Sequence, residues 1–418
     1  MVSFTSLAEE ILVSARRLDE HLASNNLPSS SFDHDTLVDL PNDVEVARDS
    51  LINTTQTLKQ LAQGGVGRAM EIAFSWTGLL SLHAIYSFKI ANAVPLNGST
   101  TYSDIAAQTS IPESFIRRFL RPAMSSHIFT SPTYDTVAHT ASSRLFVTLP
   151  DFHEGIGLQA DELAPVAAKT VDAVRTFNDS GEPHETAFAL QNKMPIFEVL
   201  GKYPERGRRF GAAMRCYTKG EGYDLRHLIE GYDWGSIDHP GAVVVDVGGG
   251  HGSVSQALAR STRNIRYVVQ DLPGTIEQAK KELPADEFAG RIEFEAHDFF
   301  TDQSVKGADV YLMRWILHDW SDGYCVKILR ALVPALEKKK ESRIVLFEYV
   351  LSEVPETRLT ERMGPDLDMI MLAVFNGAER TRREFESLLQ VADRRLRMTK
   401  FVKPEGSAMS IIEIALEG

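Results

Sequence analysis

An acidic and glycine-rich segment, VVVDVGGGHG at residues 243–252, carries the most specific chemical pattern of the chain. Asp246 ends an apolar run that is typical of a buried parallel strand, and glycines follow it closely. Glycine permits a tight turn and lets a ligand approach the backbone. Because residues 253–260 have a helical pattern, the segment predicts a strand–turn–helix unit that holds a cofactor.

Two common nucleotide-binding patterns are absent from this segment. A dinucleotide fingerprint requires G-x-G-x-x-G, and counting from Gly248 or Gly250 places a serine at the last position. A phosphate-binding loop would end in Gly-Lys-Ser or Gly-Lys-Thr, which does not occur here. An acidic residue followed by glycines instead resembles the first motif of the class I methyltransferases, which bind S-adenosylmethionine.

His318, in the segment LMRWILHDW at residues 312–320, is the candidate general base. Asp319 follows it, and Glu348 and Glu379 lie near the ends of later expected strands. Two nearby carboxylates can orient a histidine base and stabilise its cationic form. A lone histidine in an apolar segment is more often a buried structural residue, and this is the alternative interpretation.

The elements that would position these residues alternate along residues 241–418. Strands are expected at residues 242–247, 267–270, 292–296, 309–313 and 344–349, separated by helices, with a final pair near 397–402 and 410–415. This alternation predicts an α/β fold with a doubly wound, Rossmann-like sheet. Ligands bind such sheets beyond the carboxyl ends of the strands, so the acids and glycines there are expected to face one cofactor.

Two further acids at strand ends have both a binding and a structural interpretation. Asp271, which ends YVVQD, could accept hydrogen bonds from both hydroxyls of a ribose, or could cap a helix that begins near Pro273. Asp298, in AHDFF, could accept from an adenine amino group while Phe299 packs on the ring. The alternative interpretation of Asp298 is an aspartate that stabilises a turn.

The N-terminal part is expected to be mostly helical. Residues 7–22 place leucines on one helical face, a second helix near 44–61 is broken by Gly64, and the apolar residues 70–93 predict helices buried against a large surface. Residues 101–147 predict a helix–turn–helix with a two-stranded wing. Its arginines at 117, 118 and 121 could bind DNA, but a solvated face on a winged helix used for dimerisation is favoured because the chain is acidic.

Composition excludes several classes of protein. The 418 residues predict two or more domains, and a net charge of −13 argues against a nucleic acid as the main partner. Cys216 and Cys325 are too few for a disulfide framework or a cysteine-based metal site, and no compact metal-binding motif occurs. We find neither a signal-peptide core nor a membrane-spanning stretch, so a cytoplasmic protein is expected.

Six motifs in one order resemble the plant-type O-methyltransferase family, which modifies caffeate and flavonoids, and in particular its fungal secondary-metabolite branch. They are VVDVGGGHG, VVQDLP, HDFF, RWILHDW, FEYVL and DMIMLAVFNGAERT. Residues 101–147 also resemble the winged-helix dimerisation domain of that family. The resemblance implies an N-terminal helical extension at 1–66, a winged-helix dimerisation domain at 67–150, a helical connector with substrate-pocket helices at 151–240, and an S-adenosylmethionine-binding catalytic domain at 241–418.

The activity implied by the resemblance is methyl transfer from S-adenosylmethionine to a phenolic or enolic hydroxyl of a small, polyketide-like secondary metabolite, by a homodimer. Each implied pocket residue has core packing as its alternative. The implied site residues are His318, Glu348 and Glu379 for catalysis; Asp246, Gly248, Gly249, Gly250, Asp271, Leu272, Asp298, Phe299 and Arg314 for the cofactor; and Phe210, Met214, Trp315, Asp319, Met371 and Phe375 for the substrate.

The chain departs from the family pattern at two places. Phe299 replaces a usual methionine, and NGAERT replaces GGKERT, so a lysine before Glu379 is lost. With Phe375 just upstream, this predicts a more apolar pocket and argues against a phenylpropanoid acceptor.

Two rival functions remain. One is a pericyclase of the same fold that keeps the cofactor, although retention of the histidine and both glutamates favours methyl transfer. The other is a winged-helix DNA-binding regulator, which the acidic charge disfavours.

Overall fold

The computed structural model describes residues 3–38, 40–282, 288 and 290–418. The chain forms two compact units. The four domains expected from the resemblance divide the chain differently and stay a prediction. The first unit contains Met1–Pro165, Leu200–Tyr217 and Glu356–Met363, and the second contains Val166–Val199, Thr218–Pro355 and Gly364–Gly418.

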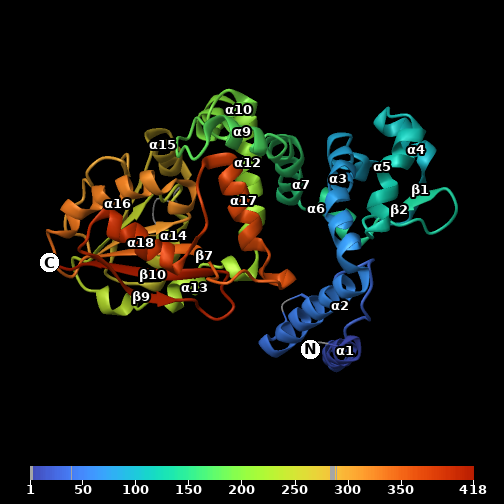
Figure 1. Cartoon of the computed structure of the whole chain (residues 1–418), viewed down its shortest axis with the longest axis horizontal. Coiled ribbons are helices and arrows are strands. Elements are labelled where there is room, and N and C mark those ends of the chain that lie inside the picture. The colour runs from blue at the N-terminus through green and yellow to red at the C-terminus, as the bar shows by residue number, and fades with distance from the viewer. Residues whose placement is uncertain (1–2, 39, 283–287, 289) are drawn as a thin grey trace. The chain divides into compact units, whose positions relative to one another are not determined.

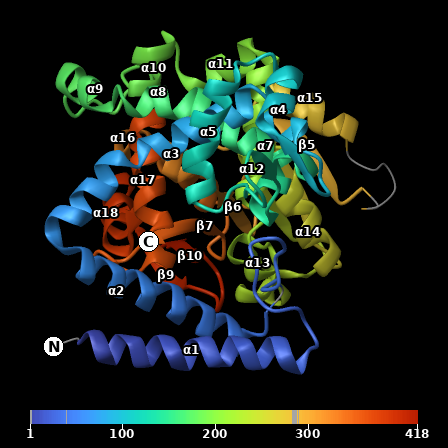
Figure 2. The same cartoon turned by 90° about the vertical axis from the view of Figure 1, so that its right-hand side faces the viewer.

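The N-terminal helices α1 (Phe4–Ser24) and α2 (Asn42–Phe74) pack along one another (Figure 2). Leu7, Leu18 and Leu22 are buried, as their helical spacing predicts. Gly64 has φ +68° and ψ 178°, so the expected break occurs there, but helical structure resumes beyond it. The expected burial of residues 70–93 is only partly correct: Ile85 and Ile90 are buried, whereas Ile72, Phe74 and Trp76 are exposed in the single chain.

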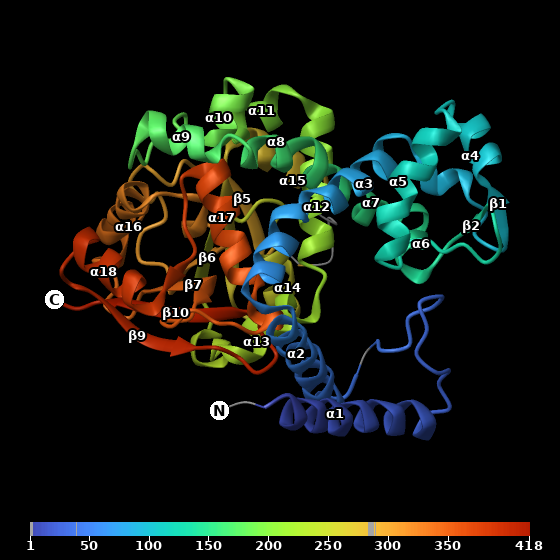
Figure 3. The same cartoon turned by 45° about the vertical axis from the view of Figure 1, so that its right-hand side comes forward.

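Residues 76–148 of the first unit form a winged-helix arrangement (Figure 3). The expected wing is only partly correct, because residues 141–148 form a helix that Thr140 caps through a capping box. The strand that pairs with residues 136–138 instead lies before the helix–turn–helix, at residues 99–101. The elements are α3 (Trp76–Ser87), η1 (Ile90–Ala93), β1 (Ser99–Thr101), α4 (Tyr102–Thr109), α5 (Glu113–Ser125), β2 (Thr136–Ala138) and α6 (Ala141–Thr148), with β1 antiparallel to β2.

Arg117, one of the three arginines considered for DNA binding, is bound within this motif. Its guanidinium pairs with Glu113 at 2.6 Å and with Asp135, and it lies 4.2 Å from the ring centroid of Tyr102. These contacts favour a structural role for this arginine.

Residues 150–237 are mostly helical, and these helices are divided between the two units, while their role as a connector stays a prediction. Its elements are α7 (Pro150–Gly157), η2 (Leu158–Leu163), α8 (Ala164–Ala167), α9 (Thr170–Phe177), α10 (Ala187–Asn192), α11 (Ile196–Lys202), α12 (Pro204–Tyr217), η3 (Glu221–Tyr223), α13 (Arg226–Gly231) and η4 (Trp234–Ile237).

A mixed sheet forms the centre of the second unit (Figure 1). Its order is β5-β4-β3-β6-β7-β10-β9, with β3 to β7 parallel and β10 antiparallel to both neighbours. The order reverses between β3 and β6, which is where a doubly wound sheet binds its ligand. The strands are β3 (Val243–Val247), β4 (Arg266–Asp271), β5 (Ile292–Ala296), β6 (Val310–Arg314), β7 (Arg343–Leu351), β9 (Leu396–Val402) and β10 (Met409–Leu416), and β8 (Arg380–Thr381) pairs with β7.

The helices of this unit follow the expected alternation with one exception. Residues 297–309 form turns instead of a helix between β5 and β6, so that expectation is wrong. Tyr311 donates its hydroxyl to Val305 O at 2.8 Å, and the side-chain amide of Gln303 donates to that of Gln270 at 2.8 Å, which fixes the turns. The helices are α14 (Ser253–Ser261), α15 (Pro273–Glu282), η5 (Leu317–Asp319), α16 (Asp322–Leu336), α17 (Met363–Phe375) and α18 (Arg382–Ala392), whereas η6 (Leu359–Glu361) belongs to the first unit.

Alternate residues of the strands enter two cores on opposite faces of the sheet. Val244 packs with Leu258 of α14 in one core, whereas Val245 packs with Leu329 of α16 and Leu388 of α18 in the other. The sheet is therefore covered on both faces, and its carboxyl edge is left to carry polar residues.

Candidate active site

The glycine turn after β3 requires glycine for two separate reasons. Gly248 and Gly250 have φ of +70° and +57°, which L side chains rarely adopt. A Cβ on Gly248 would also lie 2.5 Å from Cδ1 of Ile316. A Cβ on Gly250 would meet no atom within 4 Å, so the space beside the turn is open.

Asp246 lies under this turn and supports it. Its carboxylate accepts a hydrogen bond from the Ser255 hydroxyl at 2.7 Å, and a Cβ on Gly249 would lie 2.6 Å from Asp246 Cγ. Burial raises the pKa of Asp246 to about 6. A direct contact between Asp246 and a cofactor stays a prediction.

Asp271, the last residue of β4, joins two neighbouring loops. Its carboxylate accepts from Gly250 N–H at 2.9 Å and from Leu272 N–H at 2.7 Å, one bond to each oxygen. A carboxylate oxygen accepts more than one hydrogen bond, so both oxygens keep capacity for ribose hydroxyls. The side chain of Leu272 is exposed beside it.

Asp298 stabilises its own turn after β5. Its Oδ1 accepts from Phe300 N–H at 3.0 Å, which agrees with the turn interpretation, while an adenine contact stays a prediction. Phe299 and Phe300 each meet Trp320 edge-on, with ring centroids 5.9 and 4.7 Å apart. Trp320, which the sequence did not suggest, therefore packs against Phe299, the residue expected to lie on the adenine ring.

Arg314, the last residue of β6, and Trp315, which follows it, each have a buried nitrogen without a hydrogen-bond partner. Arg314 donates from Nη2 to Tyr223 O at 3.3 Å, but its buried Nε has no hydrogen-bond partner. Trp315 has φ +56°, uncommon for a bulky residue, and its buried Nε1 is also unpartnered. Its ring centroid lies 4.7 Å from that of His318. Strained residues of this kind cluster at functional sites.

His318 lies on the short helix η5, directly after this strand. Its Nδ1 lies 2.9 Å from Glu379 Oε1, and its Nε2 lies 3.4 Å from Asp319 Oδ1. When Glu379 is ionised its carboxylate can only accept, so Nδ1 then donates to Glu379 and leaves the lone pair on Nε2. The side chain is 12% exposed, which leaves the ring accessible on one side.

Glu348, on β7, reaches the same segment through its backbone. Oε1 accepts from both Ile316 N–H and Leu317 N–H at 3.0 Å. Oε2 is buried without a partner, and burial raises the pKa of this carboxyl. The hydrogen bonds of Glu348 therefore hold the residues that precede His318.

Glu379 is the carboxylate that contacts the imidazole. Its side chain is fully buried, its Oε2 is unpartnered, and its backbone N–H donates to Asp368 Oδ1 at 3.0 Å. Burial and the neighbouring Asp368 raise the pKa of Glu379 to about 8. Burial likewise raises the pKa of Asp319 to about 6.

The expected substrate residues are only partly brought together. Trp315 and Asp319 flank His318. Met371 and Phe375 are buried on α17, and Phe375 lies 5.5 Å from Phe197, measured between ring centroids. Phe210 and Met214 lie on α12 in the first unit, and their role stays a prediction.

Sequence reasoning missed two residues that hold the histidine. Arg380 is buried and binds the backbone on both sides of His318, and Gly377 packs against the His318 carbonyl. Both lie beside Glu379 in the motif NGAERT, but neither residue type indicates such a role by itself.

The part of the chain that the structure describes holds neither a metal-binding cluster nor a membrane-spanning helix. No three His, Cys, Asp or Glu side chains converge there in a way that could hold a metal ion. None of the helices there is both long enough and apolar enough to cross a bilayer.

Comparison with known proteins places the chain in a family. Residues 170–393 match the model of the O-methyltransferase domain. The chain belongs to this family. It is 34% identical over 416 residues to the chlorophenol O-methyltransferase of Trichoderma longibrachiatum, covering 97% of this chain and 89% of that protein. It is 36% identical to O-methyltransferase pgmB of Aspergillus terreus, covering 96% and 92% of the two chains.

Solved structures support the same fold for this O-methyltransferase. OxaC in complex with sinefungin and meleagrin matches with a TM-score of 0.78 at 24% identity and 99% coverage of both chains. LepI in complex with S-adenosylmethionine matches with a TM-score of 0.73 at 20% identity, covering 98% of this chain and 100% of that one. The protein is an S-adenosylmethionine-dependent O-methyltransferase of the fungal secondary-metabolite type.

Proposed function

We propose that this O-methyltransferase methylates a phenolic or enolic hydroxyl of a small, polyketide-like metabolite, with His318 as general base. The observation that carries the proposal is the 2.9 Å contact between His318 Nδ1 and the buried Glu379. With Glu379 ionised, this contact fixes the tautomer whose Nε2 can accept a proton, and the carboxylate stabilises the imidazolium that forms.

The turn after β3 suits S-adenosylmethionine. The open space beside Gly250 leaves room for a ligand, and Asp271 offers carboxylate oxygens beside it. We assign the ribose to Asp271 with Leu272 alongside, the methionine part to Gly248 and Gly249, and the adenine to Asp298 and Phe299. When bound, the cofactor supplies an activated methyl group together with its leaving group.

The protein residues then have to deprotonate the acceptor. A phenol has a pKa near ~10 and is mostly neutral at pH 7, so its oxygen gains nucleophilicity as the proton leaves. His318 Nε2 takes this proton, and Glu348 keeps the histidine segment in place through Ile316 and Leu317.

The position of Asp319 beside His318 indicates what kind of acceptor the site would take. Its carboxylate lies 3.4 Å from His318 Nε2, so a hydroxyl that reaches Nε2 comes close to Asp319 as well. Its negative charge favours an acceptor that arrives neutral, and it can accept a hydrogen bond from a second hydroxyl. The naming of one relative for chlorophenols supports a phenolic acceptor.

The main alternative is a pericyclic reaction. A solved structure with a TM-score of 0.73 and 20% identity is described as a pericyclic reaction enzyme, and this likeness concerns the fold alone. A pericyclase has no need of a base held by a carboxylate, so the pairing of His318 with Glu379 favours methyl transfer.

Incubation with methyl-labelled S-adenosylmethionine and a panel of phenols tests the proposal. We expect a methylated phenol and stoichiometric loss of the cofactor. Recovery of unconsumed cofactor with every phenol, together with turnover of an unmethylated polyketide, would favour the pericyclic alternative.

We also propose that the protein is a homodimer. The exposed apolar side chains Ile72, Phe74 and Trp76 lie close together in sequence near the junction of α2 and α3. Isolated exposed apolar residues are normal, whereas a group of this kind marks an interface.

A further inference from the structure

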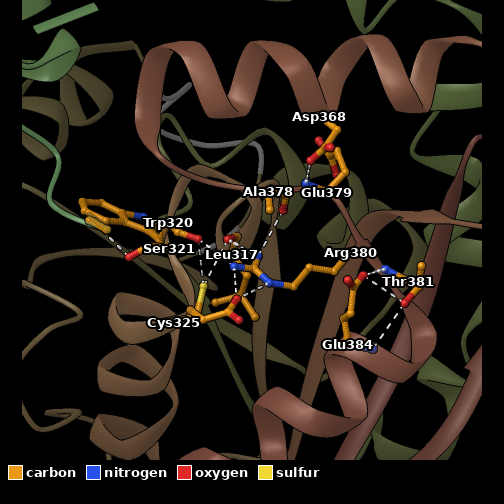
Figure 4. Close-up of polar contacts among 12 residues, drawn as sticks. Leu317, Trp320, Ser321, Cys325, Asp368, Ala378, Glu379, Arg380, Thr381 and Glu384 are labelled. Carbon is orange, nitrogen blue, oxygen red and sulfur yellow. Dashed lines mark hydrogen bonds and ion pairs between the residues drawn. The ribbon is translucent and has the colours of Figure 1, made fainter. Parts of the chain in front are cut away.

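A buried guanidinium binds the backbone on both sides of His318. Arg380 is 3% exposed, and its Nη1 donates to Leu317 O at 2.9 Å. Its Nη2 donates to Trp320 O at 2.8 Å, and Nη1 also donates to Ala378 O at 3.1 Å. Figure 4 shows the guanidinium among these carbonyls. Leu317 and Trp320 bracket the two residues of the turn that carry chemistry, so one side chain fixes both ends of that turn.

Asp322 sets the direction of this guanidinium. Its Oδ1 accepts from Arg380 Nε at 2.9 Å and from Nη2 at 2.7 Å, while the Asp322 side chain itself is 79% exposed. The planar fork of arginine matches such a set of acceptors, which the single ammonium of lysine cannot match.

The residues just before Arg380 contact the same turn. A Cβ on Gly377 would lie 2.1 Å from His318 O, so only glycine permits this approach. Ala378 N–H donates to His318 O at 3.0 Å, and Glu379 holds the imidazole. Consecutive residues 377–380 therefore hold the backbone and the ring of His318 together.

We propose that Arg380 is a positioning residue for methyl transfer: it fixes residues 317–320 so that His318 keeps its contact with Glu379 and presents Nε2 to the acceptor. This inference rests on the proposed role of His318 as the base. The positive charge of Arg380 assists, because it lowers the pKa of Glu379 against the larger opposing effects of burial and Asp368.

The test compares three variants of the full chain: Arg380→Gln, Arg380→Lys and, as a matched control, Arg382→Gln. Arg382 is 54% exposed and pairs with Glu386 at 3.0 Å, so its loss removes an equal charge two residues away without touching the turn. Two readouts need no substrate: hydrogen exchange of residues 316–321, and the rate at which diethyl pyrocarbonate modifies His318, both followed by mass spectrometry.

In Arg380→Gln we expect both rates to rise about tenfold, equivalent to the loss of one hydrogen bond from a charged donor. Arg380→Lys should recover only part of the protection, and Arg382→Gln should equal the wild type. Affinity for S-adenosylmethionine should stay within about twofold, and turnover of an active phenol should fall at least about tenfold with an unchanged KM for the cofactor.

Unchanged exchange and unchanged His318 modification in a folded Arg380→Gln variant would overturn the inference. If this variant does not fold, Asp322→Ala replaces it, because it removes the acceptor that directs the guanidinium by altering an exposed side chain; an unchanged turn in that variant overturns the inference equally. Full turnover in His318→Gln would instead refute the base assignment, while the two substrate-free readouts would still report on Arg380.

Discussion

At the scale of single residues, the site is a histidine whose two nitrogens have different surroundings. Nδ1 meets the fully buried Glu379, whereas Nε2 lies beside the partly exposed Asp319. The histidine can therefore be oriented from inside the protein while it acts on a ligand from outside.

Replacing His318 by alanine should lower turnover of a neutral phenol by roughly 10²–10⁴-fold, the usual contribution of a general base. Cofactor affinity should change little, because the side chain serves the acceptor. The loss should shrink as pH approaches the pKa of the phenol, since solvent then supplies the phenolate. Product formation measured against pH for both proteins tests this.

His239→Gln is a suitable control, because that histidine is 54% exposed beside Asp309 and should tolerate the change. An equal loss of activity at every pH in a His318→Ala protein of normal melting temperature would contradict the base assignment.

Glu379 makes stability depend on pH. Its pKa rises from 4.5 to about 8 on folding, so the folded chain binds this proton more tightly and the free energy of unfolding falls as pH rises between these values. The slope from this group cannot exceed about 1.4 kcal/mol per pH unit. Glu379→Gln removes the titration, so its melting temperature relative to wild type should rise between pH 6 and pH 8. Thermal unfolding followed by calorimetry checks this; a constant difference across that range would speak against it.

At the scale of elements, the carboxyl ends of parallel strands bring the site together. Asp271, Arg314 and Glu348 come from β4, β6 and β7, and the alternation of strands and helices predicted this meeting. The turn of residues 297–309 differs from the predicted helix, because the alternation of strands and helices alone does not show where a crossover lacks a helix. The true helix at residues 141–148 was missed because Thr140 acts as a helix cap within a segment that also has apolar, strand-like residues.

The glycine turn offers a matched pair of substitutions. Gly248→Ala and Gly250→Ala both place alanine at positive φ, but only the first also meets Ile316, at 2.5 Å. Both should lose cofactor affinity, whereas Gly248→Ala should lose clearly more melting temperature, because overpacking typically costs about 1–3 kcal/mol. Calorimetric titration and thermal unfolding measure the two effects. Equal losses of stability in both variants would show that the contact with Ile316 relaxes freely.

Tertiary contacts explain why the sequence identified Glu379 but not Arg380. A carboxylate near a histidine suggests acid–base chemistry by its type alone. An arginine that binds main-chain carbonyls has no such signature, because its partners Leu317 and Trp320 are apolar residues whose backbone accepts the hydrogen bonds.

At the scale of the whole molecule, the exposed apolar side chains near the junction of α2 and α3 predict association. Light scattering should give a mass near twice 46.5 kDa at micromolar concentration. The interface of an obligate dimer usually buries more than ~2,000 Å² of surface. Because Ile72→Glu would place a charge in this interface, it should produce monomer. Val391→Glu, at a comparably exposed position on α18, should leave the mass unchanged. A stable wild-type monomer would refute the dimer.

The docking of residues 377–380 on the histidine turn also limits how the chain can change in length. Each of these consecutive residues makes its own contact with the turn. A single inserted or deleted residue between Gly377 and Arg380 would place the wrong residue at these contacts. A substitution at one of these positions leaves the contacts of the other three in place, whereas a change of spacing moves all of them. This segment should therefore be a place where related chains differ in residue type without differing in length.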